Sequence, residues 1–316
     1  MSALHSTRRS FVHASVGALA ATIGLAGCTS QAQAPANNTD ASGDTAADQT
    51  AATKHKPVIL VTSFGTSYAS SRHITIGAIE SDIREAFPNF DVRRAFTAQT
   101  VIDHIEKDTG RHIDNFEEAM DKLIAEGATE VLVQPTHLMD GFEYADIKKS
   151  FETYESKLQK SALGTPLLAT EEDQVAVAKA LGEAMSSYDD GKTAICLMGH
   201  GTEADANSVY AKMQKVFQDL GLKSFFVATV EATPAFADVA KAAKEAGYTK
   251  AVLRPFMVVA GDHANNDMAD TSDPESFASV MRDAGFEVTC VIEGLGQLDA
   301  IDDIYVDHVS AALRGM

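Results

Sequence analysis

The feature that most constrains this chain is an apolar run that stops abruptly at a glycine–histidine–glycine turn. Residues Ala194 to Met198 are all apolar, and Gly199, His200 and Gly201 follow directly. A run without polar alternation is typical of a strand that is buried on both faces of a parallel sheet. In open α/β sheets, ligands bind at the carboxyl ends of such strands. His200 is therefore the first candidate for a functional side chain.

Two later strand candidates end in polar side chains in the same way. Residues 224–230 lead to Glu231, and residues 250–260 lead to Gly261-Asp262-His263. If the three strands share a sheet, His200, Glu231 and His263 converge. Two imidazoles and a carboxylate suit a divalent transition metal such as zinc, cobalt, nickel or iron. Each residue also has a plainer interpretation, because histidines after strands are commonly surface or hydrogen-bonding residues and Glu231 could begin the next helix.

The chain from Pro57 onward alternates between strand and helix patterns and contains an internal repeat. Gly65 and its neighbours in Ser63–Ser67 correspond to the Met198–Thr202 segment, and Met139–Glu143 corresponds to Val259–His263. We expect an α/β fold of two similar halves, residues 57–190 and 191–316, each a parallel sheet flanked by helices. A cleft between the halves is a favoured ligand site, and the metal site belongs to the second half. The expected strands are 58–63, 90–96, 129–136, 166–170, 194–198, 224–230, 250–260 and 287–292, with helices that include 71–87 and 299–313.

The first 28 residues have the pattern of an export signal. Arg8 and Arg9 precede an apolar stretch, residues 11–26, that is too short and too rich in small residues for a stable membrane span. The stretch ends in Leu25-Ala-Gly-Cys28, which resembles a lipobox, so we expect cleavage before Cys28 and lipidation of its thiol. A short signal anchor is the alternative. Residues 29–56 are polar and small, which predicts a flexible tether. The protein is then exported and lipid-anchored at the extracytoplasmic, or periplasmic, face of the membrane.

Charge and absent motifs exclude several functions. The net charge is −19, and loss of two arginines with the leader gives 24 − 45 = −21, which argues against a nucleic-acid partner. There is no dinucleotide fingerprint and no phosphate loop, so we expect no nucleotide cofactor. A Gly-x-Ser-x-Gly elbow is also absent, which argues against an ordinary α/β-hydrolase.

Several motifs together resemble one enzyme family. They are Val61–Ser67, Arg94–Thr97, Met198–Gly201, Val230–Glu231 and the long block Met257–Met268. From Pro57 to the C-terminus the chain resembles the CbiK-type anaerobic sirohydrochlorin cobaltochelatases, members of the class II chelatase superfamily. The resemblance implies two αβ halves around a tetrapyrrole cleft and insertion of cobalt(II) into sirohydrochlorin. It also implies that His200, Glu231 and His263 bind the metal, with His200 and Glu231 catalytic. The leader departs from the family pattern, so this would be an exported lipoprotein variant.

The expected chemistry needs a base, a metal site and an anion-binding surface. We expect His200 to accept a pyrrole proton and also to hold the metal. Arg93, Arg94 and Arg254 are candidates to bind the substrate carboxylates, with solvated surface arginines as the alternative. Glu143 and His137 could line the opposite wall, although a packed or solvated loop residue is the favoured interpretation of His137.

Some properties stay open at the level of sequence. Nickel and iron are alternatives to cobalt, and the chain could form a homo-oligomer. An alternative function is an anchored carrier that binds a metal, haem or another tetrapyrrole without turnover.

Overall fold

The computed structural model describes residues 56–316. The expected leader, Cys28 and nearly all of the expected tether lie outside the described residues. Among the described residues, no helix has the length and apolar character needed to cross a membrane.

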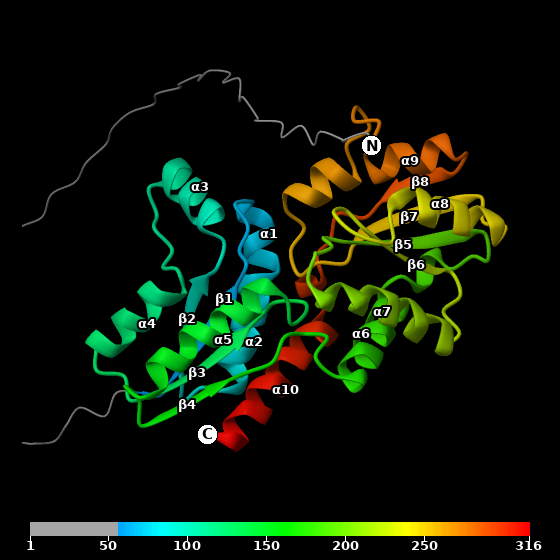
Figure 1. The fold of residues 1–316 in the computed structure, drawn as a ribbon. Coiled ribbons are helices and arrows are strands. Elements are labelled where there is room, and N and C mark those ends of the chain that lie inside the picture. The colour runs from blue at the N-terminus through cyan, green and yellow to red at the C-terminus, as the bar shows by residue number, and fades with distance from the viewer. Residues whose placement is uncertain (1–55) are drawn as a thin grey trace, which may run out of the picture. The chain divides into compact units, whose positions relative to one another are not determined.

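The described chain contains two four-stranded sheets that are both fully parallel. Their strand orders are β2-β1-β3-β4 and β6-β5-β7-β8, so the second sheet repeats the first strand for strand (Figure 1). Residues 58 to 63 of the central strand β1 are all buried, as are residues 193 to 199 of β5. This confirms the prediction of two similar αβ halves built on strands buried on both faces.

The elements of the first half are β1 (Val58–Ser63), α1 (Ala69–Ile74), α2 (Ile76–Ala86), β2 (Asp91–Phe96), α3 (Gln99–Thr109), α4 (Phe116–Ala125), β3 (Glu130–Pro135), α5 (Phe142–Glu155), β4 (Lys160–Leu163) and α6 (Glu171–Ala184). The elements of the second half are β5 (Thr193–Gly199), α7 (Ser208–Asp219), β6 (Phe225–Thr229), α8 (Phe236–Glu245), β7 (Lys250–Pro255), α9 (Phe277–Asp283), β8 (Glu287–Cys290) and α10 (Asp299–Gly315). Short 3-10 turns occur at Ser186–Tyr188, Asp205–Asn207 and Leu295–Gln297, and a π-helical turn occurs at Ala264–Met268.

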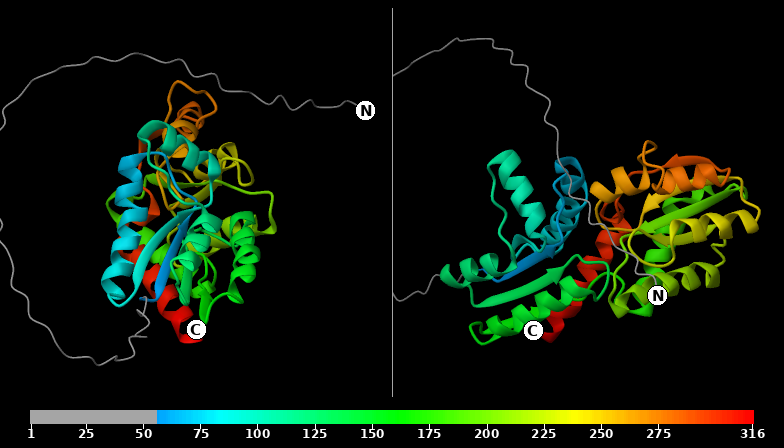
Figure 2. Two further views of the ribbon diagram at one scale, coloured as in Figure 1. Left: turned by 90° about the vertical axis from the view of Figure 1, so that its left-hand side faces the viewer. Right: turned by 45° about the horizontal axis from the view of Figure 1, so that its top comes forward.

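The last helix, α10, connects the two halves. It follows β8 in the chain but contacts α2, α6, β3 and β4 of the first half (Figure 2). The Tyr305 hydroxyl on α10 donates to the carbonyl oxygen of Thr136, just after β3, at 2.9 Å. One hydrophobic core accordingly contains Ile59 of β1, Ile195 of β5 and Ile301 of α10. The boundary near residue 190 therefore separates the two sheets but does not separate two independent cores.

The fourth strand of the first sheet differs from the sequence prediction. It is β4, Lys160–Leu163, and not residues 166–170. Leu167 and Leu168 are buried as expected, and their amides donate to the carbonyls of His137 and Leu138 just beyond β3. The segment is apolar because a loop covers the core there, and burial alone does not distinguish a loop from a buried strand.

The helix expected over residues 71–87 is interrupted at Thr75. There the backbone leaves the helical region with φ −118° and ψ −85°. The Thr75 hydroxyl donates to the Ser71 carbonyl at 2.6 Å, a local bond of the kind that competes with helix geometry. Both cysteines of the described part, Cys196 and Cys290, are free thiols.

A buried carboxyl on α10 makes stability depend on pH. Asp302 is 1% exposed, and its Oδ1 has no hydrogen-bond partner within residues 56–316. Burial, together with the neighbouring carboxylates of Asp82, Asp299 and Asp303, raises the pKa of Asp302 to about 8. The folded protein thus keeps a proton that the unfolded chain loses above pH 4, so stability falls as pH rises from about 4 to about 8.

We predict that Asp302→Asn flattens this pH dependence. Relative to the variant, the unmodified protein should lose roughly 1.4 kcal/mol of unfolding free energy per pH unit between pH 5 and 7. Denaturant unfolding at several pH values measures the difference. Asp307→Asn, at an exposed position of α10 whose carboxylate does not act on Asp302, is the control and should follow the unmodified protein. Parallel pH curves for Asp302→Asn and the unmodified protein would contradict the prediction.

Candidate metal centre

His200 lies directly after β5, on a turn that only glycines can form. A Cβ on Gly199 would lie 2.2 Å from the Tyr210 ring, and Gly201 has φ of 88°, in the left-handed region. The His200 Nδ1 is 2.8 Å from the Gly201 carbonyl oxygen. A carbonyl can only accept, so Nδ1 carries the proton. The Nε2 lone pair of the neutral ring is then free to bind a metal or a proton.

His263 lies in the loop after β7, immediately before the π-helical turn Ala264–Met268. Its Nδ1 is 2.8 Å from Oδ2 of Asp267, which lies on that turn. This hydrogen bond is the main factor that raises the pKa of His263, against the opposing effect of burial. The bond to Asp267 likewise leaves Nε2 as the free nitrogen. A carboxylate behind a metal-binding histidine is a common arrangement that fixes the ring and raises its basicity.

The two rings lie together although 63 residues separate them in sequence. Their centroids are 4.6 Å apart, with an interplanar angle of 81°. The structure therefore brings His200 and His263 to one place at the carboxyl edge of the second sheet.

Glu231 lies at the same edge but less close to the other two residues. Its Oε2 is 3.8 Å from the His200 Nδ1, and its side chain is 59% exposed. Within residues 56–316, the ligand atoms of His200, Glu231 and His263 do not all lie within 4.8 Å of one another. The Glu231 carboxylate has no hydrogen-bond partner among those residues, so it can turn toward a shared ion.

Sequence reasoning missed two residues that support this centre. Asp267 follows His263 by four positions, and this spacing on a helical turn is a signal that could have identified it. The Tyr210 hydroxyl accepts from the Gly201 amide at 3.3 Å and holds the turn that carries His200. Burial raises the pKa of Tyr210 to about 12, so the hydroxyl stays neutral. No sequence pattern pointed to Tyr210.

A loop of the first half packs against the segment that precedes His263. The Ala260 amide donates to Oγ of Ser71 at 3.1 Å. A Cβ on Gly261 would lie 2.9 Å from Oγ1 of Thr66. Two aromatic side chains of the Thr66 loop are exposed, Phe64 at 47% and Tyr68 at 36%. The loop after β1, at the carboxyl edge of the first sheet, therefore lies against the segment that leads to His263.

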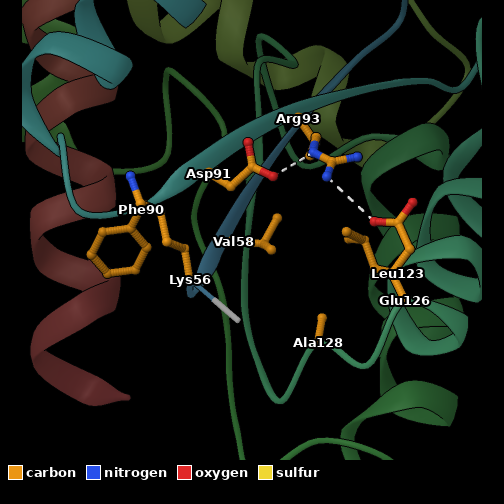
Figure 3. A pocket seen from close by; sticks show the side chains of 8 residues that line it. All are labelled: Lys56, Val58, Phe90, Asp91, Arg93, Leu123, Glu126 and Ala128. Carbon is orange, nitrogen blue, oxygen red and sulfur yellow. Dashed lines mark hydrogen bonds and ion pairs between the residues drawn. The ribbon is translucent and has the colours of Figure 1, made fainter. Parts of the chain in front are cut away.

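Each of the three arginines predicted to bind substrate carboxylates lies beside a carboxylate of the protein itself. Arg93 lines a pocket at the amino end of β1, where it bonds to Asp91 at 2.6 Å and Glu126 at 3.3 Å (Figure 3). Figure 3 shows both carboxylates flanking its guanidinium. On β2, Arg94 makes two hydrogen bonds, of 2.6 and 2.7 Å, to the buried Glu80. Arg254 is only 1% exposed and lies 3.6 Å from Glu293.

His137 and Glu143 lie in the first-half segment that corresponds to the loop around His263, and their surroundings differ. His137 is buried, with its Nε2 3.2 Å from the Thr97 hydroxyl. Burial lowers its pKa to about 4, which fits the interpretation of a packed, neutral residue. Glu143 lines a 490 Å³ pocket together with Thr97 and Lys149. Of these two residues, Glu143 is the one that lines this pocket.

Comparison with known proteins places this geometry in a family. Residues 57–314 match the family model described as Cobalt chelatase (CbiK). The sirohydrochlorin cobaltochelatase of Salmonella typhimurium is 33% identical over 259 residues, covering 82% of this chain and 97% of the relative. The sirohydrochlorin cobaltochelatase CbiKC of Nitratidesulfovibrio vulgaris is 28% identical over 263 residues, covering 83% of this chain and 92% of the relative.

A solved structure supports the same fold. The sirohydrochlorin chelatase SirB from Bacillus subtilis subspecies spizizenii, in complex with cobalt, superposes with a TM-score of 0.57 at 14% identity. The superposition covers 83% of this chain and 97% of SirB. The match over nearly all of the described residues, with the repeated parallel sheets, shows that this chain belongs to the CbiK family of cobalt chelatases.

Proposed function

We propose that this protein inserts cobalt(II) into sirohydrochlorin, using His200 and His263 to hold the incoming ion. The observation that carries the proposal is the pair of imidazoles whose Nδ1 atoms are both tied and whose rings lie 4.6 Å apart. Two free Nε2 atoms form an open site in which other ligand positions stay labile, as delivery of an ion requires. The names of the relatives support the choice of cobalt and of sirohydrochlorin.

The partners of the two histidines suggest different roles. His263 has a carboxylate behind it, Asp267, which makes it the stronger donor and the residue that retains the ion. The Nδ1 atom of His200 bonds only to a neutral carbonyl, so the Nε2 atom of His200 exchanges a metal ion for a proton more readily than that of His263 does. Glu231 completes the ligand set after turning, and its carboxylate stabilises the imidazolium that forms on His200.

The reaction releases two protons for each ion inserted. As each pyrrole N–H breaks, its electron pair becomes a bond to cobalt(II) and its proton moves to a base. The His200 Nε2 takes one proton once the ion has left it. The second proton passes to water, because the His200 side chain is 43% exposed and the Glu231 side chain 59% exposed. The two protons released carry away the two positive charges that cobalt(II) brings to the ring, so the step balances without oxidation or reduction.

The substrate would lie against the exposed aromatic side chains of the first half. Phe64, Tyr68 and Phe142 follow β1 and β3 and are between 36% and 58% exposed. A flat conjugated macrocycle suits such aromatic faces. Arg72 lies in the same region, with its Nη1 bonded to the Thr66 carbonyl at 2.6 Å. Within residues 56–316 it has no acidic partner, so its charge is available to a substrate carboxylate.

We predict that loss of either histidine reduces insertion through different kinetic constants. His200→Ala should lower kcat by about 100-fold or more, the usual contribution of a positioned base. His263→Ala should mainly raise the KM for cobalt(II). The absorption change of sirohydrochlorin with cobalt(II), nickel(II) or iron(II) measures both constants and also compares the metals.

The same assay separates an enzyme from an anchored carrier of metal, haem or another tetrapyrrole. An enzyme converts many equivalents of sirohydrochlorin, whereas a carrier gives a one-to-one spectral shift and stops. His104→Gln is a suitable control because His104 is exposed on α3 and far along the chain from both histidines. Unchanged kinetics in both active-site variants would refute the roles assigned to them.

We predict that Asp267→Asn weakens cobalt binding by about 10- to 100-fold, because the amide is a weaker partner for the His263 ring. The KM for cobalt(II) should rise more than kcat falls, and Asp267→Glu should restore part of the affinity. Asp283→Asn, an exposed change on α9, is the control. Equal cobalt affinity in Asp267→Asn and Asp283→Asn would show that Asp267 does not position His263.

We also propose that the protein is anchored by lipid on Cys28 and works at the extracytoplasmic face of the membrane. The lipobox-like Leu25-Ala-Gly-Cys28 and the polar segment that follows it support this location. Cys28→Ser should abolish lipid labelling and move the protein from the membrane fraction to the soluble fraction. A Cys28→Ser protein that is still labelled with lipid would overturn the proposal.

A further inference from the structure

A second group of metal-binding side chains lies in the first half, around the loop that joins α3 to α4. His112 is held there between two carboxylates. Its Nδ1 is 2.9 Å from Oε2 of Glu106, and its Nε2 is 3.0 Å from Oε2 of Glu118. A third carboxylate, Asp114, has its Oδ1 4.0 Å from the same Nε2. The Nε2 atom of His112 therefore faces two carboxylates, those of Glu118 and Asp114, and the Nδ1 atom faces the carboxylate of Glu106.

Neighbouring elements of regular structure position the three carboxylates of this group around His112. Glu118 belongs to the capping box of α4, where its Oε2 accepts from the Asn115 amide at 2.8 Å. The Asp114 carbonyl accepts from the Phe96 amide at 3.0 Å and ties the loop to the end of β2. Glu106 lies in the last turn of α3. The side chains are thus brought together by two helices and a strand end, and not by a free loop alone.

The spacing of the donors suits a transition metal ion. The ligand atoms of His112, Asp114 and Glu118 all lie within 4.8 Å of one another. Bonds of roughly 2.0–2.2 Å from a central ion to nitrogen and oxygen need donors slightly closer than this, so small side-chain rotations suffice. An imidazole with two carboxylates suits divalent cobalt, nickel or zinc, whereas magnesium and calcium prefer oxygen alone.

Glu106 and Lys122 orient two of the three proposed metal ligands, His112 and Asp114. Glu106 bonds to the His112 nitrogen that faces away from Asp114 and Glu118, which is the position of a carboxylate that orients a metal-bound histidine. Lys122 Nζ lies 3.1 Å from Oδ2 of Asp114, so Oδ1 stays directed to His112. The three donor side chains are between 28% and 46% exposed, which allows an ion to exchange with solvent.

We propose that His112, Asp114 and Glu118 form a second site for a divalent transition metal ion, separate from the His200–His263 centre. The site belongs to the α3–α4 region of the first half, whereas both central histidines follow strands of the second sheet (Figure 1). It holds an ion of the same chemical class as the proposed substrate metal. Because the inference rests on binding geometry, it does not depend on whether the protein inserts cobalt into sirohydrochlorin.

The test is titration calorimetry with cobalt(II) on a protein that lacks the central pair. The His200→Ala/His263→Ala double variant should still bind one cobalt(II) per chain. Adding His112→Gln should weaken that binding at least 10-fold, and Glu106→Gln should weaken it by about 10-fold. Adding His104→Gln, which changes an exposed histidine on α3, should change nothing.

Three outcomes would overturn the proposal. They are no cobalt(II) bound by the double variant, binding that His112→Gln leaves unchanged, and equally strong binding of magnesium(II), which would indicate only a diffuse acidic surface. Should the double variant not fold, the single His112→Gln change in the otherwise unmodified protein gives the same answer. It should remove one cobalt(II) equivalent and leave insertion of cobalt into sirohydrochlorin intact.

Discussion

The architecture depends on burial of the central strands on both faces. Every residue of β5 is buried, so no polar side chain can emerge before the strand ends. Gly199 and Gly201 then bring the backbone against Tyr210 and Ala232, at separations that a side chain at either position would not permit. His200 is the first side chain that can reach a ligand. The parallel arrangement places the end of β7 beside that of β5, and this adjacency explains how His263 comes within contact of His200.

A second constraint is that both imidazoles are fixed at Nδ1, one by a neutral carbonyl and one by a carboxylate. A carbonyl fixes the ring without changing its basicity much, whereas a carboxylate increases it. Under the proposed function, histidine therefore serves as an exchanging ligand at position 200 and as a retaining ligand at position 263. The internal repeat makes this asymmetry clear, because both halves share one strand order. The first-half residue that corresponds to His263 is Glu143, and the buried His137 stays neutral.

Sequence patterns predicted the parts of the fold that depend on local periodicity. The buried strands, the repeat and the positions of His200 and His263 could be found because apolar runs and glycines determine them directly. The extent of β4 could not be predicted, since Leu167 is equally buried in a loop. The environment of Arg94 depends on Glu80, 14 residues away, and the contact of α10 with the first half depends on tertiary packing. Asp267 was missed because its four-residue spacing from His263 indicates a contact only on a helical turn, and the π-helical turn Ala264–Met268 was not predicted from the sequence.

Charge must be considered locally as well as for the whole chain. A net charge of −19 favours the approach of a divalent cation and opposes that of a polycarboxylate. Arg93, Arg94 and Arg254 do little to offset this, because each faces a carboxylate of the protein. Arg72 differs, since backbone carbonyls hold it and its pKa is lowered by burial and by the like charges of Arg94 and Arg111. It therefore provides uncompensated positive charge beside the loop that contacts Gly261. An acidic protein can in this way attract the metal with its overall field and still accept an anionic macrocycle at one place on its surface.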